Sequence, residues 1–185
     1  GWEKTRIFTI ADVDGEQFGW LIEDNNPSFN VAMGLQLLKI HRPFKARVEG
    51  MDGNVVLRII RPFTWVNSII YVDNMEGQRI GSVQSKFHAW KRSYDLYIGK
   101  DRFSKIRGGA LAWDFSLQNR EGQLIGHIGC SFRGITREAL MDTGRYILEM
   151  ESVQDPETAR FYPLTISERA GMLATAICID FEYFS

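Results

Sequence analysis

The sequence predicts a mostly β protein, in which a closed antiparallel barrel surrounds a buried hydrophobic C-terminal helix. Three observations support this fold class: repeated acidic–glycine turns, strand-like runs with one apolar face, and a late segment that is apolar on every side. The 185 residues suit one domain spanning 1–185. A domain of this size buries on the order of 70% of its extended-chain surface, so it needs no disulfides to be stable.

One kind of turn recurs through the first 150 residues, each time followed by a strand-like run. The acidic–glycine pairs are Asp14-Gly15, Asp52-Gly53, Glu76-Gly77 and Glu121-Gly122. An acid–glycine pair tolerates the positive φ of a tight hairpin turn, so these pairs predict four β-hairpins. Their irregular spacing is not that of a solenoid.

The runs between the turns alternate apolar and polar residues. Trp113, Phe115 and Leu117 share one face, residues 44–48 alternate fully, and residues 94–98 alternate less cleanly. Antiparallel strands with one apolar face favour closure into a barrel, because closure removes unpaired edges.

Prolines mark the ends of the predicted strands. Pro43 and Pro62 each lie in an Arg-Pro-Phe triplet, and proline cannot donate a hydrogen bond to a sheet. Residues 151–164 contain two prolines and several charges, which predicts an irregular link to the helix.

The C-terminal segment predicts a helix from near Ile166 to about Asp180. Thr165 and Glu168 have the spacing of a capping box. From Ala170 to Ile179 no residue is charged, and a helix that is apolar all round is enclosed by protein or lies in lipid. Spanning a bilayer takes roughly 20 apolar residues, twice this run, so a buried helix is favoured over a membrane anchor. The predicted core positions are Met172, Leu173, Ala174, Ile177 and Ile179.

Asp180 is unusual because it ends this apolar helix. A carboxylate at a helix C-terminus opposes the helix dipole, so we expect Asp180 to have a partner.

Cys130 and Cys178 are far apart in sequence, and we expect both to be reduced packing residues.

Composition excludes several functions. A net charge of −1 gives no bulk attraction to nucleic acid, so no nucleic-acid partner is expected. No hydrolase, P-loop, metalloprotease or C-x-x-C motif is present, so covalent enzymatic chemistry has little support. His127 lies near Cys130, but this spacing is a weak signal for zinc.

The first residue is Gly1 and no signal or transit segment is visible, so we expect the chain to be part of a longer protein.

One segment combines basic and aromatic residues, a composition that is typical of protein surfaces in contact with phospholipid headgroups. The candidate headgroup residues are Lys86, His88, Trp90, Lys91 and Arg92. The alternative is that Phe87 and Trp90 pack into the core and the charges are solvated. A weaker second cluster comprises Arg102, Lys105 and Arg107.

Several stretches resemble the phospholipid scramblase family. They are residues 178–184 (CIDFEYF), 136–142 (TREALMD), 90–96 (WKRSYDL) and 111–115 (LAWDF), and the last two are most like the fungal mitochondrial branch. The similarity covers about residues 18–185. It implies a tubby-like fold, a closed twelve-stranded barrel around a central C-terminal helix. It also implies calcium-stimulated movement of phospholipids between leaflets, a phospholipid membrane surface as partner and a mitochondrial location.

The family's calcium loop aligns with Asp142 to Val153 and departs from the family pattern. Asp142 matches the first ligand position, but Gly144 and Val153 stand where the family has aspartate. Calcium takes six to eight oxygen ligands, several of them carboxylates. We therefore expect weak or no calcium binding through this loop, and no other cofactor.

Two functions follow from these observations. The first is a scramblase-like protein that binds or moves phospholipids at a mitochondrial membrane without covalent chemistry. The second is a non-catalytic interaction subunit of a larger mitochondrial assembly, held by protein partners.

Overall fold

Eleven antiparallel strands form one sheet, and they follow one another in chain order. The computed structural model describes residues 5–24, 43–64, 67–88, 91–107, 114–130, 146–150, 153–154, 157 and 161–183. The strands are β1 (Ile7–Ala11), β2 (Gln17–Glu23), β3 (Phe44–Gly50), β4 (Val55–Arg61), β5 (Ile69–Asp73), β6 (Arg79–His88), β7 (Lys91–Ile98), β8 (Asp101–Arg107), β9 (Asp114–Gln118), β10 (Leu124–Cys130) and β11 (Tyr146–Met150).

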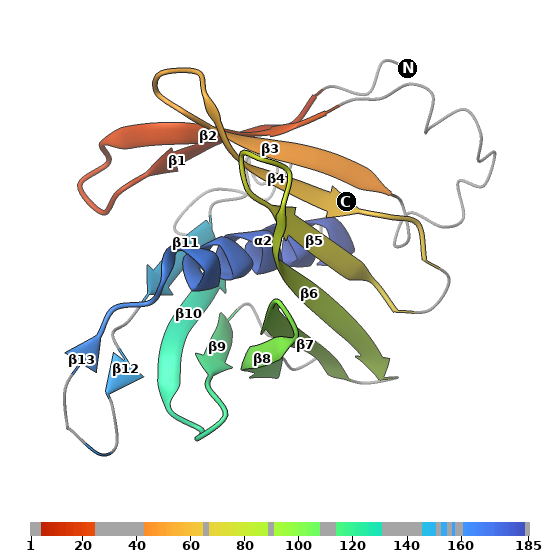
Figure 1. The fold of residues 1–185 in the computed structure, drawn as a ribbon, viewed down its shortest axis with the longest axis vertical. Coiled ribbons are helices and arrows are strands. Elements are labelled where there is room, and N and C mark those ends of the chain that lie inside the picture. The colour runs from red at the N-terminus through yellow and green to blue at the C-terminus, as the bar shows by residue number, and fades with distance from the viewer. Residues whose placement is uncertain are drawn as a thin grey trace, which may run out of the picture.

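The sheet curves around the C-terminal helix α2 (Ile166–Tyr183). Figure 1 shows α2 crossing the middle of the molecule, with β1–β4 on one side and β6–β10 on the other. Strands β5, β6, β7 and β11 contact the helix. The mostly β class with one C-terminal helix is therefore confirmed.

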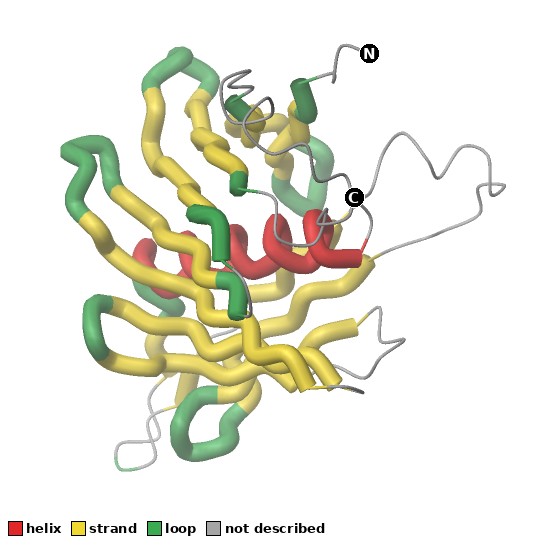
Figure 2. The backbone as a smooth tube through the Cα atoms, turned by 90° about the vertical axis from the view of Figure 1, so that its right-hand side faces the viewer, coloured by secondary structure: helices red, strands yellow, loops and turns green. Residues whose placement is uncertain are grey.

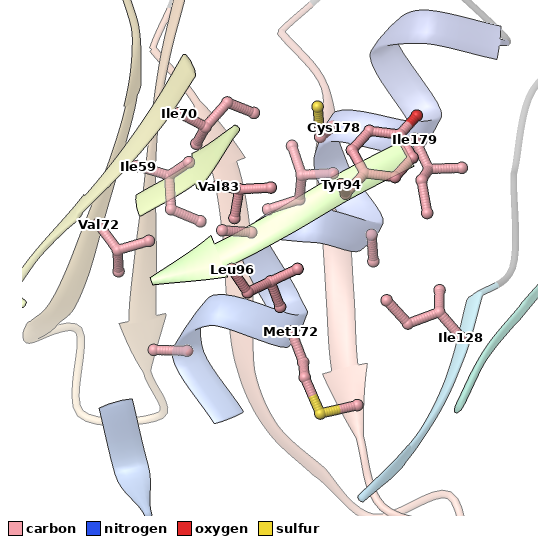
Figure 3. Close-up of a cluster of buried hydrophobic side chains, with 14 of the residues drawn as sticks. Ile59, Ile70, Val72, Val83, Tyr94, Leu96, Ile128, Met172, Cys178 and Ile179 are labelled. Carbon is pink, nitrogen blue, oxygen red and sulfur yellow. The ribbon is translucent and has the colours of Figure 1, made fainter. Parts of the chain in front are cut away.

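The predicted burial of the helix is also confirmed. Met172 and Ala174 have no exposed surface, Ile177 and Ile179 are buried, and Leu173 is partly buried against the same core. Figure 3 shows Met172, Cys178 and Ile179 among strand residues such as Val83, Leu96 and Ile128. Within the part of the chain that the structure describes, no helix has both the length and the apolar content that crossing a membrane requires.

The capping box at the start of α2 is present. Glu168 accepts a hydrogen bond from the backbone N–H of Thr165 at 2.7 Å, and Thr165 Oγ1 accepts one from the N–H of Glu168 at 3.3 Å. The helix continues to Tyr183, nearly one turn beyond the predicted end. Asp180 and Glu182 in this last turn are held by strand residues, which allows the helix to continue past its apolar run.

The four predicted hairpin turns are all present, each with its glycine at positive φ between 77° and 87°. A fifth turn, at Gly99, joins β7 to β8. In an up-and-down sheet the connections after odd-numbered strands lie at one end. Figure 2 shows these loops fanned along one side of the molecule.

The expected twelve-stranded closed barrel is not confirmed. The sheet has eleven strands, and within the described residues the edge strands β1 and β11 do not pair with each other. A side chain of α2 connects the two edges instead. Asp180 accepts hydrogen bonds from Arg6, which precedes β1, at 3.1 Å and from Tyr146 of β11 at 2.6 Å. The partner predicted for Asp180 is thus two residues, Arg6 and Tyr146, which lie at opposite edges of the sheet.

The prediction that residues 151–164 are irregular is wrong in part. Val153–Gln154 (β12) pairs with Phe161–Tyr162 (β13) in a separate two-stranded ladder. The prolines did not prevent this pairing, because Pro156 and Pro163 both fall outside the paired residues. Pro43 and Pro62 do lie at strand ends, immediately before β3 and after β4.

We predict that Ala174→Lys unfolds the protein or destabilises it by several kcal/mol, because position 174 has no exposed surface. Chemical denaturation measures the effect. Ile166→Lys, on an 82% exposed residue of the same helix, is the matched control and should change little. Near-native stability of Ala174→Lys would contradict the buried position of α2.

We predict that Asp180→Ala destabilises the protein by about 2–4 kcal/mol, because it removes the carboxylate that accepts hydrogen bonds from both Arg6 and Tyr146. Tyr146→Phe, which removes one hydrogen bond, should cost about 1 kcal/mol. In a double-mutant cycle the two effects should be non-additive. Additive effects would show that Tyr146 and Asp180 do not stabilise each other.

Candidate functional site

A buried carboxylate lies under the outer surface of β6, β7 and β8. Asp95 stands between the inward-facing core residues Tyr94 and Leu96, so its side chain points away from the helix. It is nevertheless fully buried, because two cations cover it. Lys86 Nζ lies 2.6 Å from Oδ2 of Asp95, and Arg102 Nη1 lies 3.6 Å from Oδ1. This pairing explains why residues 94–98 alternate poorly: β7 is buried on both faces there.

The predicted headgroup residue Lys86 is therefore already paired. Its hydrogen bond to Asp95, together with the charge of that carboxylate, raises the pKa of Lys86 above its ordinary value of 10.5. Because the folded-state pKa is the higher one, the stabilisation by this pair is complete below pH 10.5 and is lost only as the pH rises beyond it. At neutral pH, Lys86 holds Asp95 while about half of its side chain stays exposed.

The other predicted headgroup residues are placed only by their backbone, or lie outside the described residues. His88 ends β6 and pairs in register with Lys91, and Arg92 pairs with Phe87. The side chains of His88, Lys91 and Arg92 are not among those described, and Trp90 lies outside the described residues. Their role stays a prediction.

The second basic cluster adjoins a pocket of about 280 Å³ on the same outer surface. Its lining comes from β8, the end of β9 and the β9–β10 turn, and comprises Arg102, Ser104, Lys105, Gln118, Asn119, Arg120 and Gly122. Arg102 and Lys105 were expected to cluster. The side chain of Arg107 is not described.

Sequence reasoning missed Arg120. The sequence did contain a sign that Arg120 is unusual. Residue 120 directly precedes the acid–glycine pair of its turn, and at the same place the other three predicted turns have an apolar residue: Val13, Met51 and Met75. One cation thus interrupts an otherwise apolar pattern. Its Nε donates to the carbonyl oxygen of Arg102 at 2.7 Å, which fixes it over the start of β8.

We call Lys86, Arg102, Lys105 and Arg120 the basic face. Lys105 lies directly opposite Gln118 on β9, and it forms no ion pair with any described residue. Among the described residues, two carboxylates form ion pairs with these four cations: Asp95, and the 89% exposed Asp101, which lies 3.5 Å from Arg120. The basic face therefore carries surplus positive charge on a chain whose net charge is −1.

The loop expected to bind calcium lies mostly outside the described residues. Asp142 and Gly144 lie outside the described residues, and Val153 begins β12. The described residues contain no group of three or more His, Cys, Asp or Glu side chains suited to a metal. The expectation of weak calcium binding stays a prediction.

Two further predicted residues have defined surroundings. Nε2 of His127 lies next to Oδ1 of Asp114, and its Nδ1 lies 3.9 Å from Oε2 of Glu149. Cys178 is buried and is not in a disulfide, as expected of a reduced packing residue, and its thiol donates to Oε1 of Glu182 at 3.5 Å.

Comparison with known proteins gives a consistent result over the whole chain. The family model described as Scramblase matches residues 1–185. A phospholipid scramblase family protein of Schizosaccharomyces pombe is 30% identical over 213 residues, covering 100% of this chain and 55% of that protein. The altered inheritance rate of mitochondria protein 25 of Saccharomyces cerevisiae is 31% identical over 216 residues, covering 100% of this chain and 66% of that protein. The chain thus spans under two thirds of each relative's length. No solved structure matches.

We predict that Lys86→Met lowers the free energy of unfolding by about 1–2 kcal/mol, because among the described residues buried Asp95 then pairs only with the more distant Arg102. Adding Asp95→Asn to this variant should restore part of the loss, since the buried charge is then also removed. Lys45→Met, on an exposed lysine of β3, is the control. Equal stability of Lys86→Met and Lys45→Met would contradict a structural role for the pair.

Proposed function

The chain belongs to the scramblase family, and from this premise we propose that it is a scramblase-like protein that binds or moves phospholipids at a mitochondrial membrane. The observation that carries the proposal is the basic face. Arginine and lysine bind phosphate oxygens through charge-assisted hydrogen bonds, and every phospholipid headgroup offers such oxygens. Moving a lipid between leaflets changes no covalent bond, so the proposal needs neither a nucleophile nor a general base.

The mitochondrial part of the proposal rests on similarity. The relative from Saccharomyces cerevisiae is named for the inheritance of mitochondria, and the sequence resembles the fungal mitochondrial branch of the family.

We also propose a closed twelve-stranded tubby-like barrel as the fold of the complete domain over residues 1–185. The contacts of Arg6 and Tyr146 with Asp180 support it, because they bring both edges of the sheet to one side chain.

The enclosed helix constrains how lipid would move. Because α2 is packed inside the sheet, translocation requires a polar groove at the bilayer surface, an oligomer, or release of the helix. The basic face suits the first route, since it places cations on the outer surface of β6–β8 while the helix stays buried.

A second candidate function is a non-catalytic interaction subunit of a mitochondrial assembly. Exposed apolar side chains at the tips of three hairpin turns favour it: Val13, Met51 and Met75. All three turns lie at the same end of the sheet, where they would form a shared contact surface for protein partners.

We predict that the protein accelerates phospholipid exchange between leaflets of reconstituted liposomes, and that it does so without calcium. The expected independence from calcium follows from Gly144 and Val153 in the loop. Leaflet-selective quenching of a fluorescent phospholipid measures the rate, with protein-free liposomes as the control. Activity that requires calcium would contradict our view of the loop. A folded protein with no activity in either condition would contradict scrambling and favour the interaction subunit.

A further inference from the structure

We propose that the pocket between β8 and the β9–β10 turn binds a phosphate group, and that it prefers a phosphomonoester to a phosphodiester. The ligand is a lipid whose headgroup ends in a phosphomonoester, or a soluble phosphate with the same chemistry. The lipid source rests on the proposed function, whereas the phosphate site stands on the geometry of the pocket.

Three cations from two elements line this pocket. Arg102 and Lys105 lie on β8, and Arg120 comes from the turn that follows β9. Lys105 has no ion-pair partner among the described residues, and the exposed Asp101 neutralises Arg120 only weakly across 3.5 Å. Lys105 and Arg120 therefore keep much of their capacity to bind an anion, while Arg102 is shared with Asp95.

The pocket is held in shape before any ligand arrives. The backbone carbonyl of Arg102 fixes Arg120, and Ser104 Oγ donates to the carbonyl oxygen of Gln118 at 3.0 Å. Asn119 locks the turn, because its side chain accepts from the N–H of Gln123 at 2.8 Å and donates to Oε1 of Gln123 at 2.7 Å. Donors that are already positioned lose less conformational entropy when a ligand binds.

The number of cations favours a doubly charged ligand. A phosphomonoester carries about 1.5 to 2 negative charges at pH 7, because its second pKa is near 6, and it offers three free oxygens. A phosphodiester carries one charge and two free oxygens. Guanidinium groups bind such oxygens in pairs and an ammonium binds one as a point charge, so the third oxygen gives Lys105 a partner. The volume of about 280 Å³ also leaves room for part of the group attached to the phosphate.

The test uses the double variant Lys105→Gln/Arg120→Gln. It leaves Arg102 in place, because Arg102 covers buried Asp95 and its removal would disturb the fold. Lys45→Gln on β3 is the matched control, since it removes an exposed cation far from the pocket in the order of strands. Circular dichroism and thermal melting confirm that each variant is folded before binding is measured.

Two binding experiments separate the sources of phosphate. Flotation compares phosphatidylcholine vesicles that contain phosphatidic acid with vesicles that contain phosphatidylserine at matched surface charge. Isothermal titration calorimetry measures the binding of inorganic phosphate. We expect preferential binding to phosphatidic acid, weakened about ten-fold or more in the double variant and unchanged in Lys45→Gln.

Each outcome decides one part of the proposal. Binding of inorganic phosphate that depends on Lys105 and Arg120, without preference for phosphatidic acid, supports the phosphate site and overturns the lipid source. Equal binding to both kinds of vesicle overturns the preference for phosphomonoesters. Unchanged binding in the double variant, to vesicles and to inorganic phosphate alike, overturns the site. Selective phosphate binding by a protein without scrambling activity would remove lipid movement from the proposed function and leave the site.

Discussion

Two carboxylates at the C-terminal end of the buried helix constrain the rest of the structure. Asp180 and Glu182 lie where the helix dipole is unfavourable to negative charge, and Asp180 is buried, so both need strong partners. Tyr94 donates to Glu182 at 2.8 Å, and the buried guanidinium of Arg61 lies 3.8 Å from it. Arg6 and Tyr146, at the two edges of the sheet, hold Asp180. These contacts fix the helix along its axis and bring together strands that no ladder joins.

The same electrostatic requirement acts on the outer surface. Asp95 faces away from the core, yet it has no exposed surface, so cations must lie over it. Lys86 and Arg102 meet this need from the neighbouring strands. Lys105 and Arg120 lie nearby without comparable neutralisation, so the strand that buries an acid lies beside the cations of β8 and of the β9–β10 turn. Structural stability and the proposed lipid contact thus depend on the same few residues.

The buried helix and the basic face together favour action from the membrane surface. The most apolar segment of the chain is used inside the protein, where Met172 and Ala174 have no exposed surface. In the proposed function, the outer strand faces and turns contact the phospholipid, and charge-assisted hydrogen bonds to phosphate involve no covalent chemistry. The chain spans 55% and 66% of the length of these two relatives.

Local sequence was sufficient to predict the features that depend on a few neighbouring residues. The positive-φ glycines of the hairpin turns and the Thr165–Glu168 cap follow from local sterics and hydrogen bonds, and the apolar run from Ala170 predicted the buried helix. Only the tertiary structure decided which distant residues meet. Arg6 and Asp180 are 174 positions apart, and Arg120 reaches the pocket because β8, β9 and their turns pack in one register. Such contacts depend on how many strands form and how they pair, and a local pattern of apolar and polar residues does not specify that geometry.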